Sequence, residues 1–213
     1  MDEAAARNWL AGHFDVPRET FAQLDTFAAL LREENTRQNL VSRSTLETLW
    51  VRHIVDSAQL LLLVPQARSW IDLGRGAGFP GLIVGLLHPR PVTLIEQRKL
   101  RAEFLRRAAA SLGIEERITI LCANASQARL SAADVISARA FGPLDRIFAV
   151  AGHLTHPGTQ WVLPKGRNAQ SELEAARASW QGSFRLERSV TDDEAWIVVA
   201  GDVRRRKKGK RVQ

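Results

Sequence analysis

The stretch from Ser69 to Asp202 alternates short apolar runs with longer amphipathic ones, and this alternation restricts the fold more than any other feature of the chain. It begins with "WIDL" and "FPGLIVGLLH" and continues through "PVTLIEQ" and "KLRAEFLRRAAASLG". Such alternation is typical of α/β proteins, in which helices cover both faces of a parallel sheet. The last two runs, "SFRLERSV" and "AWIVVAGD", follow each other directly. We therefore expect the sheet to finish with an antiparallel pair.

The residues before this alternation predict helices. In residues 19–41 the apolar side chains recur at spacings of three and four, as an amphipathic helix requires, and they are Phe21, Leu24, Phe27, Leu30 and Leu31. A second helix is predicted to start at Ser44, which forms a capping box with Glu47. Pro65 is expected to end it.

The chain of 213 residues is long enough for one full core and shows no low-complexity linker. We expect one domain over residues 1–202, made of a helical leader (1–66) and an α/β core (67–202). Residues 203–213 are predicted to form a basic, disordered tail. The tail accounts for the whole formal net charge of +7, through Arg204, Arg205, Arg206, Lys207, Lys208, Lys210 and Arg211.

A concentrated basic segment of this kind pairs readily with phosphates through counterion release, so we expect the tail to contact nucleic acid. The alternative is a solvated tail that only aids solubility. A membrane surface is less favoured, because the tail has no apolar face.

Composition also restricts the compartment. The chain has no apolar stretch long enough to span a bilayer, and it begins with an acidic rather than a basic segment. Cys122 is the only cysteine, so it cannot form a disulfide within the chain or a cysteine-based zinc site. His153 and His156 have no nearby acids or cysteines, and we expect no metal. A soluble, cytoplasmic protein is the prediction.

A glycine-rich loop follows the first apolar run of the alternating region. It reads D-x-G-x-G-x-G, with the residues Asp72, Gly74, Gly76 and Gly78, and Gly81 extends it to G-x-G-x-x-G. In open α/β sheets ligands bind beyond the carboxyl ends of the strands, and glycines let the backbone approach them closely. Glu96, at the end of the second predicted strand, can accept hydrogen bonds from both hydroxyls of a ribose. The loop therefore predicts a nucleoside-containing ligand, with a purely structural turn as the alternative.

Three observations favour S-adenosylmethionine over a nicotinamide cofactor. The Asp72 carboxylate would pair with the ammonium of a methionyl group, directly or through water, but would repel a pyrophosphate. Pro80 removes one amide donor where a phosphate would need it. The chain is also too short for a complete dinucleotide fold with an added substrate domain.

Several motifs together resemble those of one family. They are "NLVS" at 39–42, "VRHIVDS" at 51–57, "DLGRGAGFPG" at 72–81, "SARAF" at 137–141 with Pro143 and Leu144, and "LPKG" at 163–166. In order and spacing they resemble the bacterial small-subunit ribosomal RNA methyltransferase G family, also called glucose-inhibited division protein B. The resemblance implies a class I methyltransferase sheet, Rossmann-like, with S-adenosylmethionine as cofactor. It also implies methyl transfer to N7 of one guanine in 16S rRNA, with that RNA or the small ribosomal subunit as partner.

The resemblance also implies roles for individual residues. Gly74 and Phe79 would line the methionine end of the cofactor, and Glu96 would bind its ribose. Ala125 and Ser126 would lie at the adenine, whereas Arg139 would stand at the methyl-transfer face.

Two positions depart from the family pattern. Arg75 replaces a small hydroxyl residue within the glycine loop. We expect its side chain to point into solvent, and the alternative is that it reaches the carboxylate of the cofactor. Residues 124–126 read "NAS" where the family usually has an acidic residue. Adenine binding is then expected to use backbone amides and the side chains of Asn124 or Ser126.

Methylation of guanine N7 requires no general base, because that lone pair is free at neutral pH. Catalysis would come from proximity and orientation, with Arg139 and Lys165 as positioning groups. Arg139 would hold guanine O6 or a phosphate and leave N7 open. The alternatives are a structural ion pair for Arg139 and a solvated side chain for Lys165.

Other residues are expected to support this chemistry. Arg52 and Asp56 are four apart on a predicted helix and would pair there, tying the helical leader to the pocket, whereas His53 and Ser57 would share the adjoining face. Phe79 and Phe141 are expected to stack on a nucleobase, because each lies in a loop beyond a strand.

Two other functions remain open at this point: a non-catalytic RNA-binding module and a small NAD-dependent oxidoreductase. The RNA-binding module predicts affinity for RNA without any cofactor, whereas the oxidoreductase predicts binding of NAD. A monomer is expected for the methyltransferase.

Overall fold

The computed structural model describes residues 1–74 and 76–207, so Arg75 and the tail residues 208–213 lie outside the described part. Seven strands form one sheet in the order β3-β2-β1-β4-β5-β7-β6. The first five strands are parallel and β7 is antiparallel to both neighbours. The strands are β1 (Trp70–Leu73), β2 (Val92–Ile95), β3 (Ile118–Leu121), β4 (Val135–Ala138), β5 (Gln160–Lys165), β6 (Trp180–Arg188) and β7 (Trp196–Arg205). The predicted α/β sheet with an antiparallel end is confirmed, although β7 inserts between β5 and β6.

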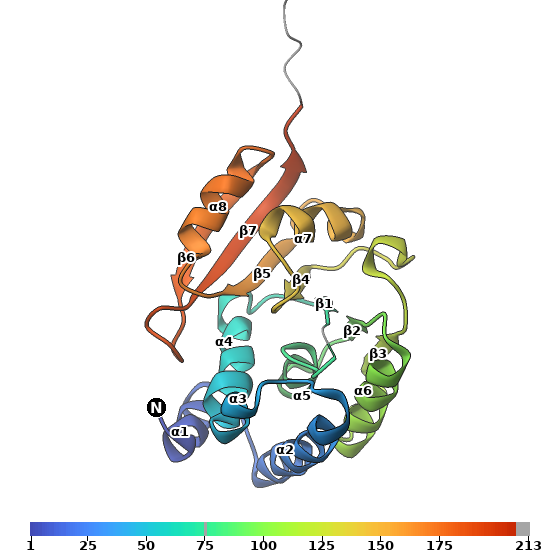
Figure 1. The fold of residues 1–213 in the computed structure, drawn as a ribbon, viewed down its shortest axis with the longest axis vertical. Coiled ribbons are helices and arrows are strands. Elements are labelled where there is room, and N and C mark those ends of the chain that lie inside the picture. Colours follow the sequence, from blue (N-terminus) through green and yellow to red (C-terminus); the bar gives the residue numbers. More distant parts are fainter. Residues whose placement is uncertain (75, 208–213) are drawn as a thin grey trace, which may run out of the picture.

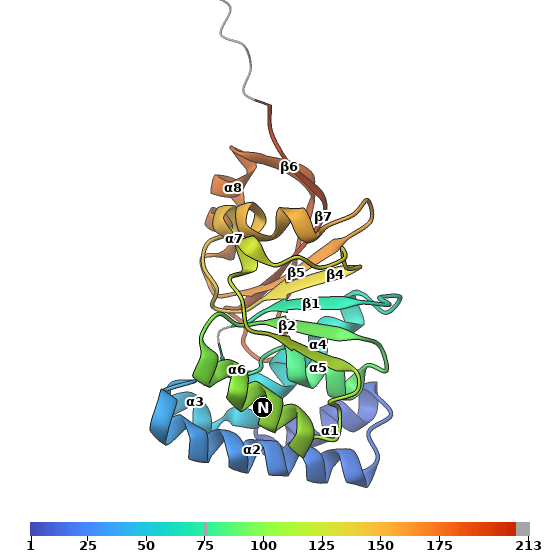
Figure 2. The same ribbon diagram turned by 90° about the vertical axis from the view of Figure 1, so that its right-hand side faces the viewer.

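Helices cover both faces of the sheet, as Figures 1 and 2 show. On one face lie α5 (Gly81–Leu87) and α6 (Lys99–Ser111), and on the other lie α7 (Leu144–Ala151) and α8 (Ala169–Arg177). All four residues of β1 are buried, because both faces of the sheet are covered. Trp70 packs into the core on the side of α5 and α6, whereas Ile71 and Leu73 pack into the core on the side of α7 and α8.

The first part of the helical leader forms an additional layer outside α5 and α6, whereas its last helix lies beside α5 (Figure 2). It contains α1 (Glu3–His13), α2 (Arg18–Gln38), α3 (Arg43–Glu47), the π-helix η1 (Trp50–Val55) and α4 (Asp56–Leu63). Helix α2 packs on α6, and α4 packs on α5. The helix predicted within 19–41 is confirmed as α2, although it ends at Gln38, and Leu24, Phe27 and Leu31 are fully buried.

The second predicted helix is wrong in its start and its continuity. The residue that precedes α3 is Ser42, not Ser44, and Ser42 has extended backbone angles. The helix then breaks at Thr48 and continues as η1 before α4 begins. Five of the six η1 residues are buried, so tertiary packing surrounds this segment on nearly all sides. A single amphipathic stripe does not describe such a segment.

The predicted tail boundary at residue 203 is also wrong. Strand β7 continues to Arg205, and the Arg206 amide donates a hydrogen bond of 2.8 Å to the Ser179 carbonyl. Val203 packs against the core, so these residues belong to the sheet. A deletion after Asp202 would remove the end of a strand rather than an independent tail.

Within the described residues, no helix combines the length and the apolar character needed to cross a membrane.

The start of α5 is fixed by a close approach to two strands. The Gly81 amide donates a hydrogen bond of 3.0 Å to Asp72 Oδ2. A Cβ atom at Gly81 would lie 2.6 Å from Leu94 Cγ and 2.8 Å from that same carboxylate oxygen. Glycine is therefore required here by space and not by backbone conformation.

We predict that Gly81→Ala lowers the free energy of unfolding by about 1–3 kcal/mol, because the methyl group overpacks the junction of α5 with β1 and β2. Urea denaturation measures the change. Gly12→Ala is the matched control, since a Cβ atom there meets nothing within 4 Å. In α1 that change should stabilise by roughly 0.5–1 kcal/mol. Equal effects of the two substitutions would contradict the packing explanation.

Candidate active site

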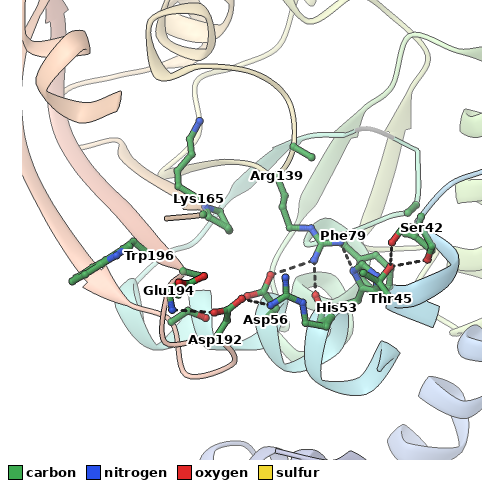
Figure 3. Close-up of a pocket in the computed structure, with 18 of the residues that line it drawn as sticks. Ser42, Thr45, His53, Asp56, Phe79, Arg139, Lys165, Asp192, Glu194 and Trp196 are labelled. Atoms are coloured by element: carbon green, nitrogen blue, oxygen red, sulfur yellow. Dashed lines mark hydrogen bonds and ion pairs between the residues drawn. The ribbon is translucent and has the colours of Figure 1, made fainter. Parts of the chain in front are cut away.

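Two cavities lie at the edge of the sheet where the parallel strands end, one of about 670 Å³ and one of about 180 Å³. The large cavity is drawn in Figure 3, and its lining includes Ser42, His53, Asp56, Phe79, Arg139, Lys165, Asp192, Glu194 and Trp196. The small cavity is lined by residues that include Gly74, Glu96, Arg98, Asn124, Ala125, Phe141 and Arg146.

The same two loops line both cavities. In the loop after β1, Gly74 lines the small cavity whereas Ala77 and Phe79 line the large one. In the loop after β4, Phe141 lines the small cavity and its neighbours Ala140 and Gly142 line the large one. The cavities are therefore adjacent spaces on either side of a shared wall.

Glu96 gives the small cavity its clearest chemical character. Its side chain is 3% exposed, and Oε1 accepts a hydrogen bond of 2.8 Å from the Arg98 amide. Oε2 is buried and has no hydrogen-bond partner. A buried carboxylate oxygen without a partner is costly. This oxygen therefore requires a donor from whatever fills the cavity, and a ribose hydroxyl meets that requirement.

The "NAS" segment forms the far side of the small cavity. Asn124 and Ala125 line it, and Asn124 Oδ1 accepts hydrogen bonds from the Ser126 amide at 3.0 Å and the Ser126 hydroxyl at 2.9 Å. Ser126 itself is exposed and does not line either cavity. Of the two residues expected at an adenine, the structure brings only Ala125 to the cavity.

The two inner glycines of the loop, Gly76 and Gly78, are required by the conformation of its backbone. Gly76 and Gly78 have φ angles of 87° and 84°, which side-chain-bearing residues rarely adopt. Both are buried, and neither lines a cavity. At Gly76 a Cβ atom would lie 2.2 Å from Arg101 Cδ, so this glycine lets a long side chain cross the loop. Arg75 lies outside the described residues.

Asp72 does not reach either cavity. Its side chain is 0% exposed, Oδ1 accepts a hydrogen bond of 2.6 Å from Ser137 Oγ, and Oδ2 accepts one from Gly81. Ser137 Oγ in turn accepts from Trp70 Nε1 at 2.8 Å. Burial raises the pKa of Asp72 to about 6. The predicted direct contact of this carboxylate with an ammonium group does not fit its position, because Asp72 instead ties β1 to β4 and α5.

Arg139 spans the gap between the sheet and the helical leader (Figure 3). Its Nη1 donates to Asp56 Oδ2 at 3.2 Å and to the Arg52 carbonyl at 3.0 Å, and its Nη2 contacts His53 Nδ1 at 2.5 Å. The guanidinium also lies 5.1 Å from the centre of the Phe79 ring. The side chain is 18% exposed, and it lines the large cavity.

The predicted pair between Arg52 and Asp56 is wrong. Arg52 instead forms an ion pair of 2.5 Å with Asp192, and Asp56 pairs with Arg139. The spacing rule fails because Arg52 lies in a π-helix, whose turns are wider than those of an α-helix. The expected tie between the helical leader and the pocket does exist, but different partners make it.

His53 is held neutral in this network. Burial and the neighbouring Arg139 lower the pKa of His53 to about 3. Because its Nδ1 accepts from a guanidinium, the ring proton resides on Nε2, which is buried without a partner. His53 also stacks on Phe79 with ring centres 4.8 Å apart.

The two candidate stacking residues have different positions. Phe79 is 5% exposed and packs against His53 and Phe27, so its predicted stacking on a nucleobase does not fit this arrangement. Phe141 is half-buried and lines the small cavity, with the Arg146 guanidinium 5.9 Å from its ring centre. Of these two residues, only Phe141 lines the small cavity.

Lys165 fixes the loop after β4. Its Nζ donates to the Gly142 carbonyl at 2.7 Å and pairs with Glu172 Oε1 at 2.6 Å. The same Glu172 oxygen accepts from the Leu144 amide at 2.6 Å. The side chain is 10% exposed, so the alternative of a solvated lysine is wrong. In this arrangement Lys165 positions the loop and is already paired.

Sequence reasoning missed one wall of the large cavity, the β6–β7 hairpin loop. Asp192, Glu194 and Trp196 line the cavity from this loop and the start of β7. The loop is held against the helical leader, where the Thr191 hydroxyl donates to Asp56 Oδ1 at 3.0 Å. The acidic segment "TDDE" between the last two strands was the only sequence signal for this wall. It does not indicate that the hairpin loop lies against the helical leader.

The arrangement is that of a class I methyltransferase fold. Among solved structures it is similar to the O-methyltransferase from Bacillus cereus in complex with SAH, with a TM-score of 0.59 and 14% identity over 93% of this chain and 97% of that one. The O-methyltransferase TomG from Streptomyces achromogenes, solved with SAM, also has a TM-score of 0.59, at 12% identity over 93% and 96% of the two chains.

Sequence comparison is more specific. The family model described as rRNA small subunit methyltransferase G (GidB) matches residues 20–194. Proteins named ribosomal RNA small subunit methyltransferase G are 50% identical in Rhizorhabdus wittichii, over 99% of this chain and 98% of the relative, and 44% identical in Zymomonas mobilis, over 99% and 100%. This chain belongs to the rRNA small subunit methyltransferase G family, and the predicted family is confirmed.

The low pKa of His53 predicts a pH dependence of stability. Between about pH 6.5 and 3 the unfolded chain binds a proton on this ring that the folded protein does not bind. The contribution is therefore fully present above pH 6.5 and declines as the pH falls, by up to about 1.4 kcal/mol per pH unit. His53→Gln, which keeps an acceptor for Arg139, should flatten this decline. Urea unfolding between pH 7 and pH 4 measures the slope.

Asp72 provides a control of opposite sign. Its pKa is raised from 3.8 to about 6, so the folded protein binds the additional proton in that range. Acidification through this range partly offsets the loss from His53, and Asp72→Asn should make the decline steeper. An unchanged slope in His53→Gln would contradict the assignment of a neutral, buried imidazole.

Proposed function

We propose that this protein transfers the methyl group of S-adenosylmethionine to N7 of a guanine in 16S rRNA of the small ribosomal subunit. The observation that carries the proposal is the shared wall between the two cavities. Neighbouring residues of one loop, Ala140, Phe141 and Gly142, line alternate cavities. A cofactor bound in one cavity and a nucleotide bound in the other would therefore meet across two short loops. Family membership supports the choice of RNA as the methyl acceptor.

The small cavity fits the nucleoside part of the cofactor. The partnerless Glu96 Oε2 would accept from the ribose hydroxyls, and Phe141 and Ala125 would contact the adenine. Gly74, at the start of the loop, would lie toward the methionine part. When bound, S-adenosylmethionine supplies an electrophilic methyl carbon. Two solved structures of similar fold contain SAM or SAH, which supports the choice of this cofactor.

The large cavity fits a nucleophile that needs no base. Guanine N7 carries a free lone pair at neutral pH, so no proton has to leave before methyl transfer. The ionisable groups of this cavity agree with that requirement, because Asp56 and Lys165 are paired and His53 is held neutral. The chain would accelerate the reaction by holding the two reactants in line. Arg139 would bind guanine O6 or a flanking phosphate, and Lys165 would hold the loop that carries Phe141.

Because N7 requires no deprotonation, we infer that the reaction uses no metal. We also propose that the protein acts as a monomer, and in the cytoplasm, where ribosomal subunits are present. A non-catalytic RNA-binding module and an NAD-dependent oxidoreductase are the competing functions that the following two experiments separate from methyl transfer.

We predict that Glu96→Gln weakens binding of S-adenosylhomocysteine by about 10- to 100-fold, because a charged acceptor contributes roughly 1.5–3 kcal/mol to such hydrogen bonds. Isothermal titration calorimetry measures the affinity, with NAD as the comparison ligand. Glu103→Gln is the matched control, since that glutamate is exposed on α6 and lines neither cavity. Equal affinities of the two variants, or tighter binding of NAD, would reject this cofactor site.

The function itself is tested with small ribosomal subunits from cells that lack this enzyme. Incubation with tritium-labelled S-adenosylmethionine should label 16S rRNA, and mass spectrometry of the nucleosides should find 7-methylguanosine. Arg139→Lys keeps the charge but loses the forked geometry, and should reduce kcat by at least about tenfold. RNA that binds without being labelled would favour the non-catalytic module. A methyl group on another atom would contradict the N7 assignment.

A further inference from the structure

The basic segment at the C-terminal end of β7 is held in a fixed position. Arg204 and Arg205 pair in register with Gln181 and Trp180 at the start of β6. Next along the chain, the Arg206 guanidinium donates through Nε to the Arg177 and Trp180 carbonyls, at 2.8 and 3.2 Å. The first charges after Asp202 therefore belong to a rigid edge of the sheet.

Four cations at this edge form what we call the C-terminal basic surface: Arg177, Arg204, Arg205 and Lys207. All four are exposed. Over residues 1–74 and 76–207, the structure contains no ion pair between any of them and a carboxylate. The sequence adds Lys208, Lys210 and Arg211 directly after them. Their charge is not compensated by a neighbouring acid within the described chain, so it is available to an external polyanion.

This surface lies at the opposite end of the sheet from the candidate active site. Trp196, at the start of β7, pairs with Lys165 and lines the large cavity. Arg205 is the last residue of that ten-residue strand, which spans roughly 30 Å. Figure 1 shows β7 running from the hairpin beside α4 to the far end of the molecule. A nucleotide in the large cavity therefore cannot also contact the basic surface.

We propose that the C-terminal basic surface is a second RNA contact, which binds the phosphate backbone of small-subunit rRNA roughly 30 Å from the nucleotide that is methylated. The inference rests on the proposed function. Arginines suit phosphate oxygens through bidentate contacts. A span of roughly 30 Å corresponds to about nine nucleotide steps of a duplex strand. Only an RNA that extends from the methylated nucleotide to the basic surface can occupy both sites at once. A short fragment of RNA would occupy the active site alone.

The test compares one charge-removing variant with two controls. The variant is Arg204→Gln with Arg205→Gln and Lys207→Gln, and it retains Arg206 because that side chain fastens the strand. One control removes three exposed cations elsewhere, by Arg18→Gln, Arg32→Gln and Arg90→Gln. The other control keeps the charge at the basic surface, by Arg204→Lys, Arg205→Lys and Lys207→Arg. Urea unfolding verifies that all three proteins are folded.

Two substrates provide the readout: intact small subunits from cells that lack the enzyme, and a stem-loop of about 15 nucleotides around the methylated guanine. With intact subunits, the charge-removing variant should lose at least about tenfold in kcat/KM at 0.15 M salt. The slope of log affinity against log salt should become smaller in magnitude by about 2 to 3, because three cations are removed and each phosphate contact contributes about 0.7–0.9 to it. With the stem-loop, kcat/KM should stay unchanged. The charge-keeping control should retain the salt slope of the original protein, because it keeps the number of cations at the surface.

Three results would overturn the proposal. They are an unchanged salt slope with intact subunits, an equal loss in the control that removes cations elsewhere, and an equal loss on the stem-loop. Binding of the surface to anionic phospholipid vesicles, with no effect on subunit binding, would assign it to membranes instead. If the original protein methylates neither substrate, the proposed function fails, whereas the salt slope of subunit binding still decides whether this surface contacts RNA.

Discussion

The guanidinium of Arg139 holds together two parts of the chain that lie 83 residues apart, the end of β4 and the start of α4. It is mostly buried, and it meets the Asp56 carboxylate, the Arg52 carbonyl and the neutral ring of His53. A buried cation requires such partners, since removal of one of them leaves a charge without compensation. The position of the loop after β4 is therefore coupled to that of the helical leader.

That loop is strained at Ala140 and fixed on both sides of it. Ala140 has a φ angle of 52°, which is unfavourable for a residue with a side chain. Arg139 anchors the residue before it, and Lys165 holds the Gly142 carbonyl after it. The strain persists because both neighbours are fixed. The result is a short, rigid wall whose residues face two cavities in turn, so that one structural element would position both the proposed cofactor site and the proposed substrate site.

Most of the fold was predictable because its signals are local. The alternation of apolar runs identified the strands, and the glycines and Glu96 marked the edge of the sheet where the cavities lie. The contacts that shape the site were not predictable from spacing, because the partners are distant in sequence. Arg52 was expected to pair with Asp56, four residues away, but a π-helix redirects both to more distant partners, Asp192 and Arg139. Lys165 likewise finds its acid on a helix that follows it, which no strand pattern indicates.

The most direct test of this account is a crystal structure of the protein bound to S-adenosylhomocysteine. We predict that the adenosine lies in the small cavity, that its ribose hydroxyls are within hydrogen-bond distance of Glu96 Oε2, and that the pair between Arg139 and Asp56 is intact. The sulfur would face the large cavity beside the loop after β4. A nucleoside bound elsewhere, or an Arg139 side chain released from Asp56 to hold the ligand, would contradict the central claim that one rigid wall serves both sites.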